Sequence, residues 1–293
     1  MDNESGIPIL DFLKSSGVTL EEGSEGWKEM SKKVREALEN HGAFHLWCDE
    51  ISNELREKMF TCMKSLFELP EETKLKFSNS RGYAKNHVIG HCESFRIYDA
   101  LKQDTIENFT NLMWSKGNPN FCETLSSLIS KTRELSLLIL KMVVEGFGLP
   151  EKYISEVEKL NSHSDSRMTR YHLPEENKDS EIALVPHTDR GTMAIIFHNE
   201  VQGLQVLTKS GNWANVNIPP NGFIVLVGGM LKAWSNGRIQ APKHRVVTRG
   251  DKERLSFILF AVPNQETLIK VPSELVNEDH PLRYKPFKYE PRS

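Results

Sequence analysis

The apolar residues in the first half of the chain recur at helical spacing. Over residues 26–40 and 51–67 they fall three and four positions apart, which is the pattern of an amphipathic helix with one buried face. A longer stripe of the same kind predicts a helix over residues 123–147, ended by Gly148. Between the first two helices, the short apolar run over residues 43–47 predicts a strand.

The second half of the chain has a different pattern, in which short apolar runs alternate with turn residues. Such regular short strands indicate a sandwich, a barrel or a double-sheet jelly roll. We predict an α+β fold in which a mostly helical region, residues 1–160, packs on a double-stranded β-helix (jelly roll) core, residues 161–293. No linker separates the two regions, so they should form one globular unit. The predicted strands cover residues 167–173, 182–186, 193–197, 204–207, 223–227, 245–248 and 255–262.

Composition argues against several classes of partner. The chain has 293 residues, a formal net charge of -3 and no long run of Lys or Arg, which disfavours nucleic acid and membrane surfaces. The longest apolar runs are too short to cross a bilayer, and the first ten residues lack the pattern of a signal peptide. The four cysteines form no CxxC pair, so we expect free thiols. We therefore expect a cytoplasmic protein with a small-molecule partner.

The candidate metal ligands are two histidines and an aspartate. His187 and Asp189 form an HxD motif, and side chains two positions apart on a strand point to the same side. His244 opens a later predicted strand. Two histidines and one carboxylate leave three octahedral positions open on iron(II), which suits a chelating co-substrate and oxygen.

An HxD motif alone is weak evidence, because similar motifs occur elsewhere in the sequence. Residues 163–165 form a second HxD, and residues 91–93 and 198–200 form HxE motifs. We interpret all three as surface or turn pairs. The polar, Ser-rich surroundings of residues 163–165 predict a loop there.

A second pair of residues distinguishes the first HxD motif from the others. Arg254 and Ser256 are two positions apart, so they share one face of a predicted strand. The turn over residues 249–252 predicts a hairpin, which would place His244 and Arg254 on neighbouring strands. An unpaired buried arginine is costly. A bound dicarboxylate would remove that cost, because one carboxylate pairs with the guanidinium while the keto-acid end chelates the metal.

At this point the sequence resembles a known family, the plant soluble 2-oxoglutarate- and iron(II)-dependent dioxygenases, which are related to isopenicillin N synthase. The resemblance covers nearly the whole chain, and it is strongest toward the branch of the AOP-type oxygenases and the auxin oxidases. The motifs follow in the order and spacing typical of the family: Ile7-Pro8-Ile9-Leu10-Asp11, Gly42-Ala43-Phe44, Phe67-Glu68-Leu69-Pro70, His187-Thr188-Asp189, Gly203-Leu204-Gln205-Val206, Trp234-Ser235-Asn236-Gly237, His244-Arg245-Val246 and Arg254-Leu255-Ser256.

The resemblance implies an iron(II)-dependent oxygenase with 2-oxoglutarate as co-substrate and ascorbate as a reductant. His187, Asp189 and His244 would bind the iron, and Arg254 and Ser256 would bind the distal carboxylate of 2-oxoglutarate. Decarboxylation of the co-substrate gives succinate, carbon dioxide and an oxidant that removes hydrogen from a substrate carbon. Hydroxylation is the default outcome, with desaturation, ring closure and demethylation as alternatives. Family members are often monomers, and we expect a monomer here.

Two positions depart from the pattern of the family. Tyr171 matches a tyrosine that often binds the co-substrate, but the asparagine usual two residues earlier is replaced by Thr169. A threonine can still donate a hydrogen bond. Gly228-Gly229 stands where Gly-Asp is common, and this change has either a structural role or the effect of loosening the pocket wall.

The substrate should be a small, fairly apolar specialised metabolite or hormone. An acidic group on it would meet Arg96 or His91, although a solvated surface role for both is an equal alternative. Family pockets are lined from three parts of the chain, which point to Tyr98, Phe109, Trp114, Ile195, Phe197, Met230, Phe260 and Val262. Core packing is the competing interpretation for each of these eight residues.

Two other functions fit parts of the same evidence. The first is an iron(II) oxidase of the same fold that does not use 2-oxoglutarate, because such relatives keep the Arg-x-Ser pair. The second is a non-catalytic small-molecule binding protein whose metal site is structural or vestigial. The intact set of ligands together with Arg254 and Ser256 argues against the second alternative. Dependence of turnover on 2-oxoglutarate would distinguish the predicted oxygenase from the first alternative.

Overall fold

The structure is a computed structural model, and it describes residues 5–13, 20–78, 82–86, 91–174 and 179–290. Its helices are α1 (Glu25–Asn40), α2 (Asn53–Phe67), α3 (Glu71–Leu75), α4 (Gln103–Met113), α5 (Pro119–Gly146), α6 (Ile154–Lys159) and α7 (Gly229–Trp234). Its strands are β1 (Ile9–Asp11), β2 (Ala43–Trp47), β3 (Tyr83–Asn86), β4 (Cys92–Ile97), β5 (His163–Tyr171), β6 (Ser180–His187), β7 (Met193–His198), β8 (Leu204–Leu207), β9 (Trp213–Asn215), β10 (Phe223–Val227), β11 (His244–Arg249), β12 (Arg254–Val262), β13 (Leu268–Ile269) and β14 (Phe287–Lys288).

The helices predicted from apolar spacing are confirmed as α1, α2 and α5. Each begins at a residue whose side chain caps the first turn. The hydroxyl groups of Ser24 and Ser52 and the amide oxygen of Asn118 accept hydrogen bonds from backbone N–H groups three residues on, which satisfies donors that the helix cannot pair itself. Helix α4 was missed by the sequence analysis. Its first residue lacks a capping side chain, so no start signal precedes its apolar face.

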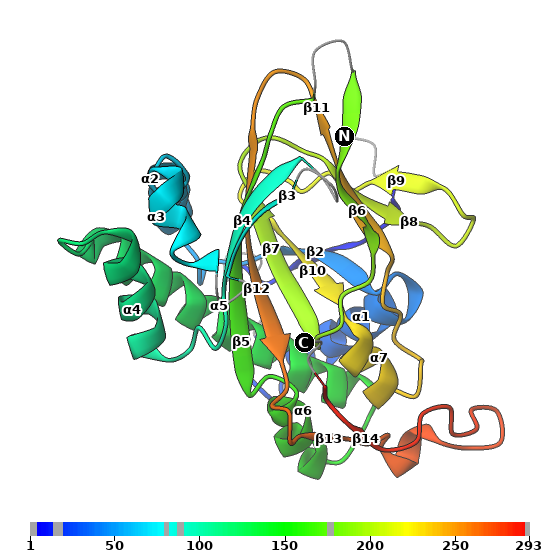
Figure 1. The fold of residues 1–293 in the computed structure, drawn as a ribbon. Helices are drawn as coiled ribbons and strands as arrows, with labels where there is room; N and C mark the ends of the chain where they lie inside the picture. Colours follow the sequence, from blue (N-terminus) through cyan, green and yellow to red (C-terminus); the bar gives the residue numbers. More distant parts are fainter. Residues whose placement is uncertain (1–4, 14–19, 79–81, 87–90, 175–178, 291–293) are drawn as a thin grey trace.

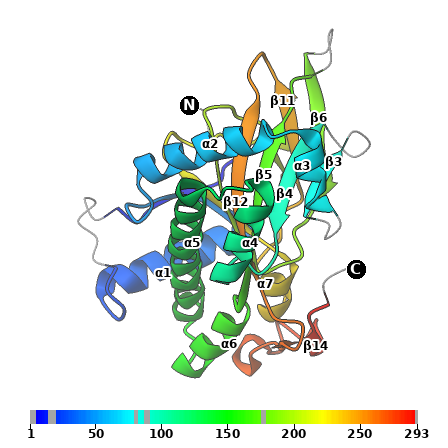
Figure 2. The same ribbon diagram turned by 60° about the vertical axis from the view of Figure 1, so that its left-hand side comes forward.

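The larger sheet has eight strands in the order β1-β2-β10-β7-β12-β5-β4-β3. Strands β1 to β4 come from the first half of the chain, where the apolar pattern had predicted only β2. Helices cover one face of this sheet, and Figure 2 shows α1 and α5 side by side against it. The large core lies between sheet and helices, and it includes Phe95, Met168, Ile195, Phe197 and Phe257.

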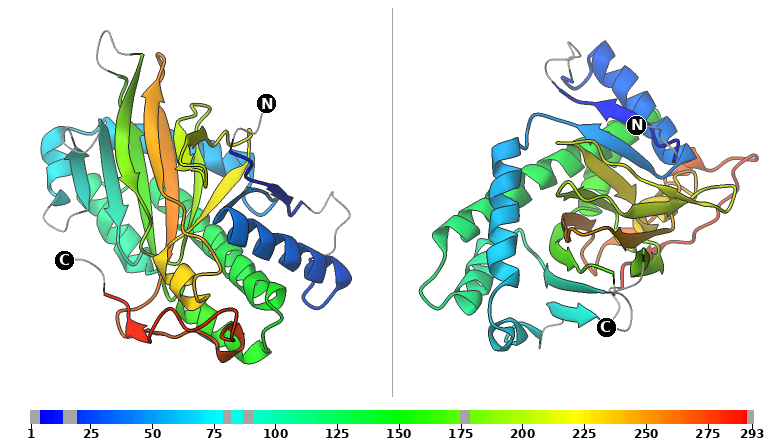
Figure 3. Two further views of the ribbon diagram at one scale, coloured as in Figure 1. Left: turned by 90° about the vertical axis from the view of Figure 1, so that its right-hand side faces the viewer. Right: turned by 90° about the horizontal axis from the view of Figure 1, so that it is seen from above.

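The smaller sheet has four strands in the order β6-β11-β8-β9. It lies over the other face of the larger sheet (Figures 1 and 3). A second apolar cluster joins the inner faces of both sheets, with Ala194 and Ile258 from the larger sheet and Leu204 and Val246 from the smaller one. The chain is therefore a mixed helix-and-sheet structure, as predicted, with helices on one side of two facing sheets.

Several local predictions are wrong. Residues 91–93 are not a surface or turn pair, because Glu93 lies on β4 and is buried. The turn after β11 does not join a hairpin, because β11 pairs with β6 and β8 in the smaller sheet while β12 pairs with β5 and β7 in the larger one. A short polar turn looks the same in the sequence whether its strands pair or cross between two sheets. Residues 163–165 are not a loop but the start of β5. Their polar side chains are ordered by pairing with β12, from His163 opposite Val262 to Asp165 opposite Phe260.

The C-terminal segment runs along one end of the sheets, drawn in red in Figures 1 and 3. It forms the two-stranded sheet β13-β14. It also brings the largely buried Tyr289 to the space between the eight-stranded and the four-stranded sheet. All four cysteines are free thiols, as predicted. Within the described residues, no helix has the length and apolar character needed to span a membrane.

Candidate metal and co-substrate site

Three potential metal ligands meet at one end of the smaller sheet. His187 is the last residue of β6, His244 is the first of β11, and the two are direct partners across the ladder. Asp189 lies in the loop just beyond β6 rather than on the strand. Its Oδ1 atom lies 3.7 Å from Nε2 of His187 and 3.9 Å from Nε2 of His244. One ligand atom from each residue lies within 4.8 Å of the other two, a spacing that fits a single ion.

Backbone carbonyl groups fix which nitrogen of each histidine faces the centre of the site. Nδ1 of His187 lies 2.9 Å from the carbonyl oxygen of Val185, and Nδ1 of His244 lies 3.2 Å from that of Pro242. A carbonyl oxygen can only accept, so in both rings Nδ1–H donates and Nε2 keeps its lone pair. Both lone pairs thus converge near Asp189, as metal ligation by histidine requires.

Burial also prepares His187 for ligation. It lowers the pKa of the imidazole below its usual value, and the electrostatic effect of the neighbouring His244 acts in the same direction. The ring is therefore neutral at pH 7, which is the state that binds a metal.

The N-terminus of α7 holds the loop that carries Asp189. The backbone N–H of Gly229 donates to the carbonyl of Asp189 at 2.8 Å, and that of Met230 donates to Gly191 at 3.0 Å. A Cβ on Gly228 would collide with the carbonyl of Gly191, whereas one on Gly229 would meet only ordinary contacts. Neither glycine lines the cavity, which favours the structural interpretation of this departure.

A cavity of about 720 Å³ lies between the two sheets and contains the three candidate ligands in its wall. Its apolar lining comes from both sheets and includes Leu184, Ile196, Leu204 and Ile258. Tyr171, Arg254 and Ser256 also line it, so the structure brings together the predicted metal and co-substrate residues. A mostly apolar cavity with a few convergent polar groups is typical of a small-molecule site.

Polar groups without partners surround the co-substrate end of this cavity. Arg254 is 2% exposed, and its Nε and Nη1 atoms have no hydrogen-bond partner among the described residues. The same is true of the hydroxyl groups of Ser256 and Thr169, which lie directly opposite each other on β12 and β5. Thr169 lies beside the cavity and is not among the residues that line it. The Arg254 guanidinium stacks over the ring of Tyr171, 5.0 Å from its centroid.

Buried hydrogen-bond donors without partners, like those of Arg254, Ser256 and Thr169, are unfavourable unless a ligand accepts hydrogen bonds from them. Burial lowers the pKa of Arg254 from its usual value, while Tyr171 acts to raise it. The cluster therefore has the character of a preformed anion site.

His198 is a buried neighbour of this cluster on β7, whereas the sequence analysis had interpreted it as part of a surface or turn pair. It pairs with Ser256 across β7 and β12, and its Nδ1 donates to the carbonyl of Asn199. Burial lowers its pKa to about 3, with a further contribution from Arg254. The ring therefore adds no second positive charge beside Arg254 at neutral pH.

The predicted substrate residues divide into two groups. Tyr98, Phe260 and Val262 line the cavity, and their role in substrate binding stays a prediction. The other five do not line it: they lie in or against the core between sheet and helices, and they are Phe109, Trp114, Ile195, Phe197 and Met230.

Strand β7 shows the physical reason for this error. Its first five residues, 193–197, are all apolar and are buried on both faces, so the sequence does not reveal which alternate set faces the cavity. Ile196 lines the cavity, whereas its neighbours Ile195 and Phe197 pack toward the helices. A shift of one residue moves a side chain to the opposite face of the sheet.

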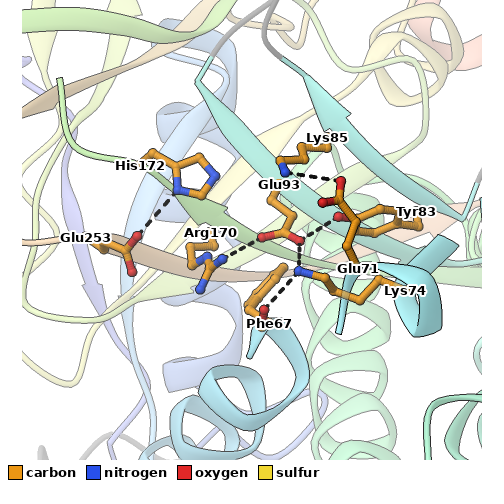
Figure 4. A network of polar contacts seen from close by, with 9 residues as sticks. All are labelled: Phe67, Glu71, Lys74, Tyr83, Lys85, Glu93, Arg170, His172 and Glu253. Carbon is orange, nitrogen blue, oxygen red and sulfur yellow. Dashed lines mark hydrogen bonds and ion pairs between the residues drawn. The ribbon is translucent and has the colours of Figure 1, made fainter. Parts of the chain in front are cut away.

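A second buried polar cluster lies on the helix side of β4 and β5 (Figure 4). Glu93 is 1% exposed, and its carboxylate accepts hydrogen bonds from Lys74 at 2.5 Å, Tyr83 at 2.6 Å and Arg170 at 2.8 Å. Lys74 also donates to the carbonyl of Phe67. The cluster thus ties α2, α3, β3, β4 and β5 together. The sequence analysis missed it because its members are far apart along the chain.

Two protein families match this chain. Residues 163–263 match the 2OG-Fe(II) oxygenase superfamily, and residues 7–118 match the family described as non-haem dioxygenase in morphine synthesis N-terminal. The first match spans the strands that carry the candidate ligands, and the second spans α1 to α4.

Individual relatives match over almost the full length. The chain is 36% identical to a probable 2-oxoglutarate-dependent dioxygenase, AOP1, of Arabidopsis thaliana, over 97% of this chain and 94% of the relative. It is 27% identical to the 2-oxoglutarate-dependent dioxygenase AOP3 of the same plant, over 96% and 92%.

The fold matches solved dioxygenases for auxin oxidation. The rice protein aligns with a TM-score of 0.81 at 26% identity, over 96% of this chain and 92% of that one. The Arabidopsis thaliana protein, solved with 2-oxoglutarate, aligns with a TM-score of 0.82 at 26% identity, over 94% and 99%.

Proposed function

Because the chain belongs to the 2-oxoglutarate- and iron(II)-dependent oxygenases, we propose that His187, Asp189 and His244 hold its iron and that Arg254 and Ser256 bind its co-substrate. The enzyme is thus an oxidoreductase that couples oxidation of a small molecule to conversion of 2-oxoglutarate into succinate and carbon dioxide. The finer assignments below concern its own residues and its substrate.

The observation that carries the proposal is the set of buried donors without partners at Arg254 and Ser256. A carboxylate of 2-oxoglutarate would accept hydrogen bonds from the guanidinium and the Ser256 hydroxyl, removing the cost of their burial. Thr169 lies opposite Ser256 and has a free buried hydroxyl, so it adds a further donor in place of the asparagine usual in the family. Tyr171 packs beside the guanidinium and limits its movement.

The donor set at the other end of the co-substrate fits iron(II). Two neutral imidazoles and one carboxylate occupy three positions and leave the rest for the keto acid and oxygen. Asp189 has a buried Oδ2 atom without a partner, which a cation would satisfy. Bound iron(II), together with 2-oxoglutarate and oxygen, supplies the oxidising power for the reaction. The protein's own part is to hold both imidazoles in one tautomer, orient the co-substrate and exclude water through apolar walls.

The substrate of this enzyme is, on this proposal, a small specialised metabolite or hormone that enters the same cavity. The similar dioxygenases for auxin oxidation act on a substrate of this kind. Tyr98, Phe260 and Val262 line the part of the cavity available to it, and hydroxylation is the expected reaction. We further propose a monomeric, cytoplasmic enzyme that uses ascorbate as a reductant.

The finer description of the fold belongs to this proposal as well. The two facing sheets over residues 161–293 would form a double-stranded β-helix, with residues 1–160 packed against it as one globular unit. The cavity between the two sheets, which is lined by residues of β5, β6, β7, β8, β11 and β12, supports this description.

The experiment that tests the proposal is an anaerobic titration of metal-free protein with iron(II) and then 2-oxoglutarate. A visible charge-transfer band of the iron–keto acid chelate is expected in the parent, absent in His187→Ala and weakened in Arg254→Ala. The matched control is Arg249→Ala, which removes an exposed arginine outside the cavity and should keep the parent's band. A folded parent without the band would overturn the assignment and favour a non-catalytic binding protein.

A further inference from the structure

Two arginines face each other across the ladder inside the cavity. Arg96 on β4 and Arg167 on β5 are direct register partners, and both line the cavity. Like charges placed directly opposite on a sheet are destabilising. This arrangement therefore needs a compensating negative charge, and the described residues supply only part of it.

Nearby acidic groups are already engaged. Arg96 donates to Asp165 at 2.8 Å, and Asp99 pairs with Lys102 at 2.6 Å. Arg167 forms no ion pair with any described residue, and it donates a hydrogen bond to the Ser94 hydroxyl at 3.3 Å. Arg96 also keeps a buried Nε donor without a partner. The pair thus retains unmatched positive charge and at least one free donor.

The position of the pair distinguishes it from the co-substrate pocket. Along β5, Arg167 is two residues from Thr169, or about 7 Å at the rise of a strand. Opposite Arg167 on β12 stands Ile258, and Arg96 lies over the ring of Phe260 at 5.3 Å. The two guanidinium groups thus adjoin the apolar wall of the cavity, one step beyond the residues assigned to 2-oxoglutarate.

We propose that the enzyme's organic substrate is an acid, with an apolar body against Ile258 and Phe260 and a carboxylate bound by Arg167 and Arg96. This inference rests on the proposed function and adds the substrate class to it. The carboxylate accepts hydrogen bonds from the free donors and screens the repulsion between the two arginines. Arg167 is a specificity-determining residue, because a neutral substrate would leave its charge uncompensated.

The test measures binding rather than turnover. Protein loaded with Mn(II) and 2-oxoglutarate, both in excess and without oxygen, is titrated calorimetrically with phenylacetate and cinnamate and with their neutral amides. The saturating co-substrate keeps the acids out of the Arg254 pocket. The parent should bind each acid at least about tenfold tighter than its amide, as expected for charge-assisted hydrogen bonds. Phenyl sulfate, run beside them, shows whether the site prefers a sulfate ester to a carboxylate.

Three variants separate recognition from folding. Arg167→Gln should lose the preference for acids, Arg167→Lys should keep part of it, and the charge-matched control Arg249→Gln should keep all of it. Thermal unfolding without ligand provides a second readout: Arg167→Gln should be at least as stable as the parent, since the cross-strand repulsion is gone.

The outcomes bear on this inference separately from the proposed function. The inference is overturned by equal affinity of the parent for acid and amide, by failure of every acid to bind, or by an unchanged preference in Arg167→Gln. In each case the charge-transfer band with iron(II) and 2-oxoglutarate would persist. Loss of that band in the parent would instead contradict the proposed function. Tighter binding of phenyl sulfate would support the anion site while changing its natural ligand from carboxylate to sulfate.

Discussion

The larger sheet has a buried polar cluster on each of its two faces, and strand β5 takes part in both clusters. The charge of one cluster is compensated, whereas that of the other is not. On the helix side, the carboxylate of Glu93 accepts from three donors. On the cavity side, Arg254 and the hydroxyl groups of Ser256 and Thr169 have donors without partners. Thr169, Arg170 and Tyr171 are consecutive, so neighbouring residues of one strand belong to the two different clusters.

The contrast shows how buried polar residues divide between structure and binding. In a compensated cluster every charged group already has its partners, so the effect of the cluster is to hold the secondary-structure elements together. Burying an uncompensated cluster in a cavity is unfavourable, and the stability of the rest of the fold offsets this free energy. A bound ligand then removes it by pairing with the buried groups. Burial alone would not distinguish Glu93 from Arg254, because both are almost inaccessible. The distinguishing observation is the number of partners.

The largest expected effect comes from breaking the compensated cluster. Glu93→Gln leaves Lys74 and Arg170 without their buried counter-charge, which should lower the free energy of unfolding by about 3 kcal/mol. Denaturant unfolding followed by circular dichroism measures this. Affinity for 2-oxoglutarate should stay within about threefold of the parent.

A matched control tests whether burial is responsible. Glu253→Gln removes a carboxylate that contacts His172 at the surface (Figure 4), and it should cost at most about 1 kcal/mol. A loss in Glu93→Gln as small as that in the control would contradict a structural role for the cluster.

The second effect comes from removing the uncompensated charge. Arg254→Leu should weaken 2-oxoglutarate binding about 100-fold or more, the loss typical of truncating one partner of a buried charge pair. In the absence of 2-oxoglutarate its stability should not fall, because an unpaired buried cation is replaced by an apolar side chain of similar volume. Isothermal titration and thermal unfolding of the same samples measure both quantities. A strongly destabilised Arg254→Leu protein would show that Arg254 has a structural role, like the residues of the Glu93 cluster.

The smallest effect is a difference in acid sensitivity. Burial acts to raise the pKa of Glu93, but hydrogen bonds from Lys74 and Tyr83 and the nearby positive charges outweigh it, and the pKa lies below its usual value. A carboxyl group with a lowered folded-state pKa stabilises the protein above its unfolded-state pKa. That stabilisation is lost as pH falls through the folded-state value.

The parent should therefore lose stability more steeply than Glu93→Gln as pH falls below about 4.5, the ordinary range of a glutamate. Chemical unfolding at a series of pH values between 3 and 6 measures the two slopes. Parallel curves would show that the carboxylate of Glu93 is not the group responsible.

The sequence predicted the parts of the site that local patterns encode. The ligands His187 and Asp189 are two positions apart, as are Arg254 and Ser256, and this spacing was enough to group each pair. Alternation along a strand explains only the second pair, because Asp189 lies beyond the end of β6. The structure brings the pairs into one cavity. It does so from two different sheets rather than from the hairpin that the sequence suggested, because a turn motif does not specify which strands pair.

The parts that the sequence did not predict depend on long-range contacts. The structural role of Glu93 depends on Lys74, Tyr83 and Arg170, which only the folded chain brings to its carboxylate. The choice of Ile195 instead of Ile196 as a cavity residue failed because residues 193–197 of β7 are all apolar. Likewise, the like-charged pair of Arg96 and Arg167 exists only through the register of β4 with β5.

Strand β12 has a consequence for how such an enzyme diversifies. Arg254, Ser256, Ile258, Phe260 and Val262 face the cavity, while the residues between them pack against the helices. Substitutions at Ile258, Phe260 and Val262 would thus change the substrate cavity while leaving the core between sheet and helices and the co-substrate residues earlier on the strand in place. A gene library randomised at these three codons should contain a high proportion of folded enzymes with altered preferences. Residues of one strand can therefore change in evolution to accept new substrates, while the other residues of the same strand keep the fold and the co-substrate site intact.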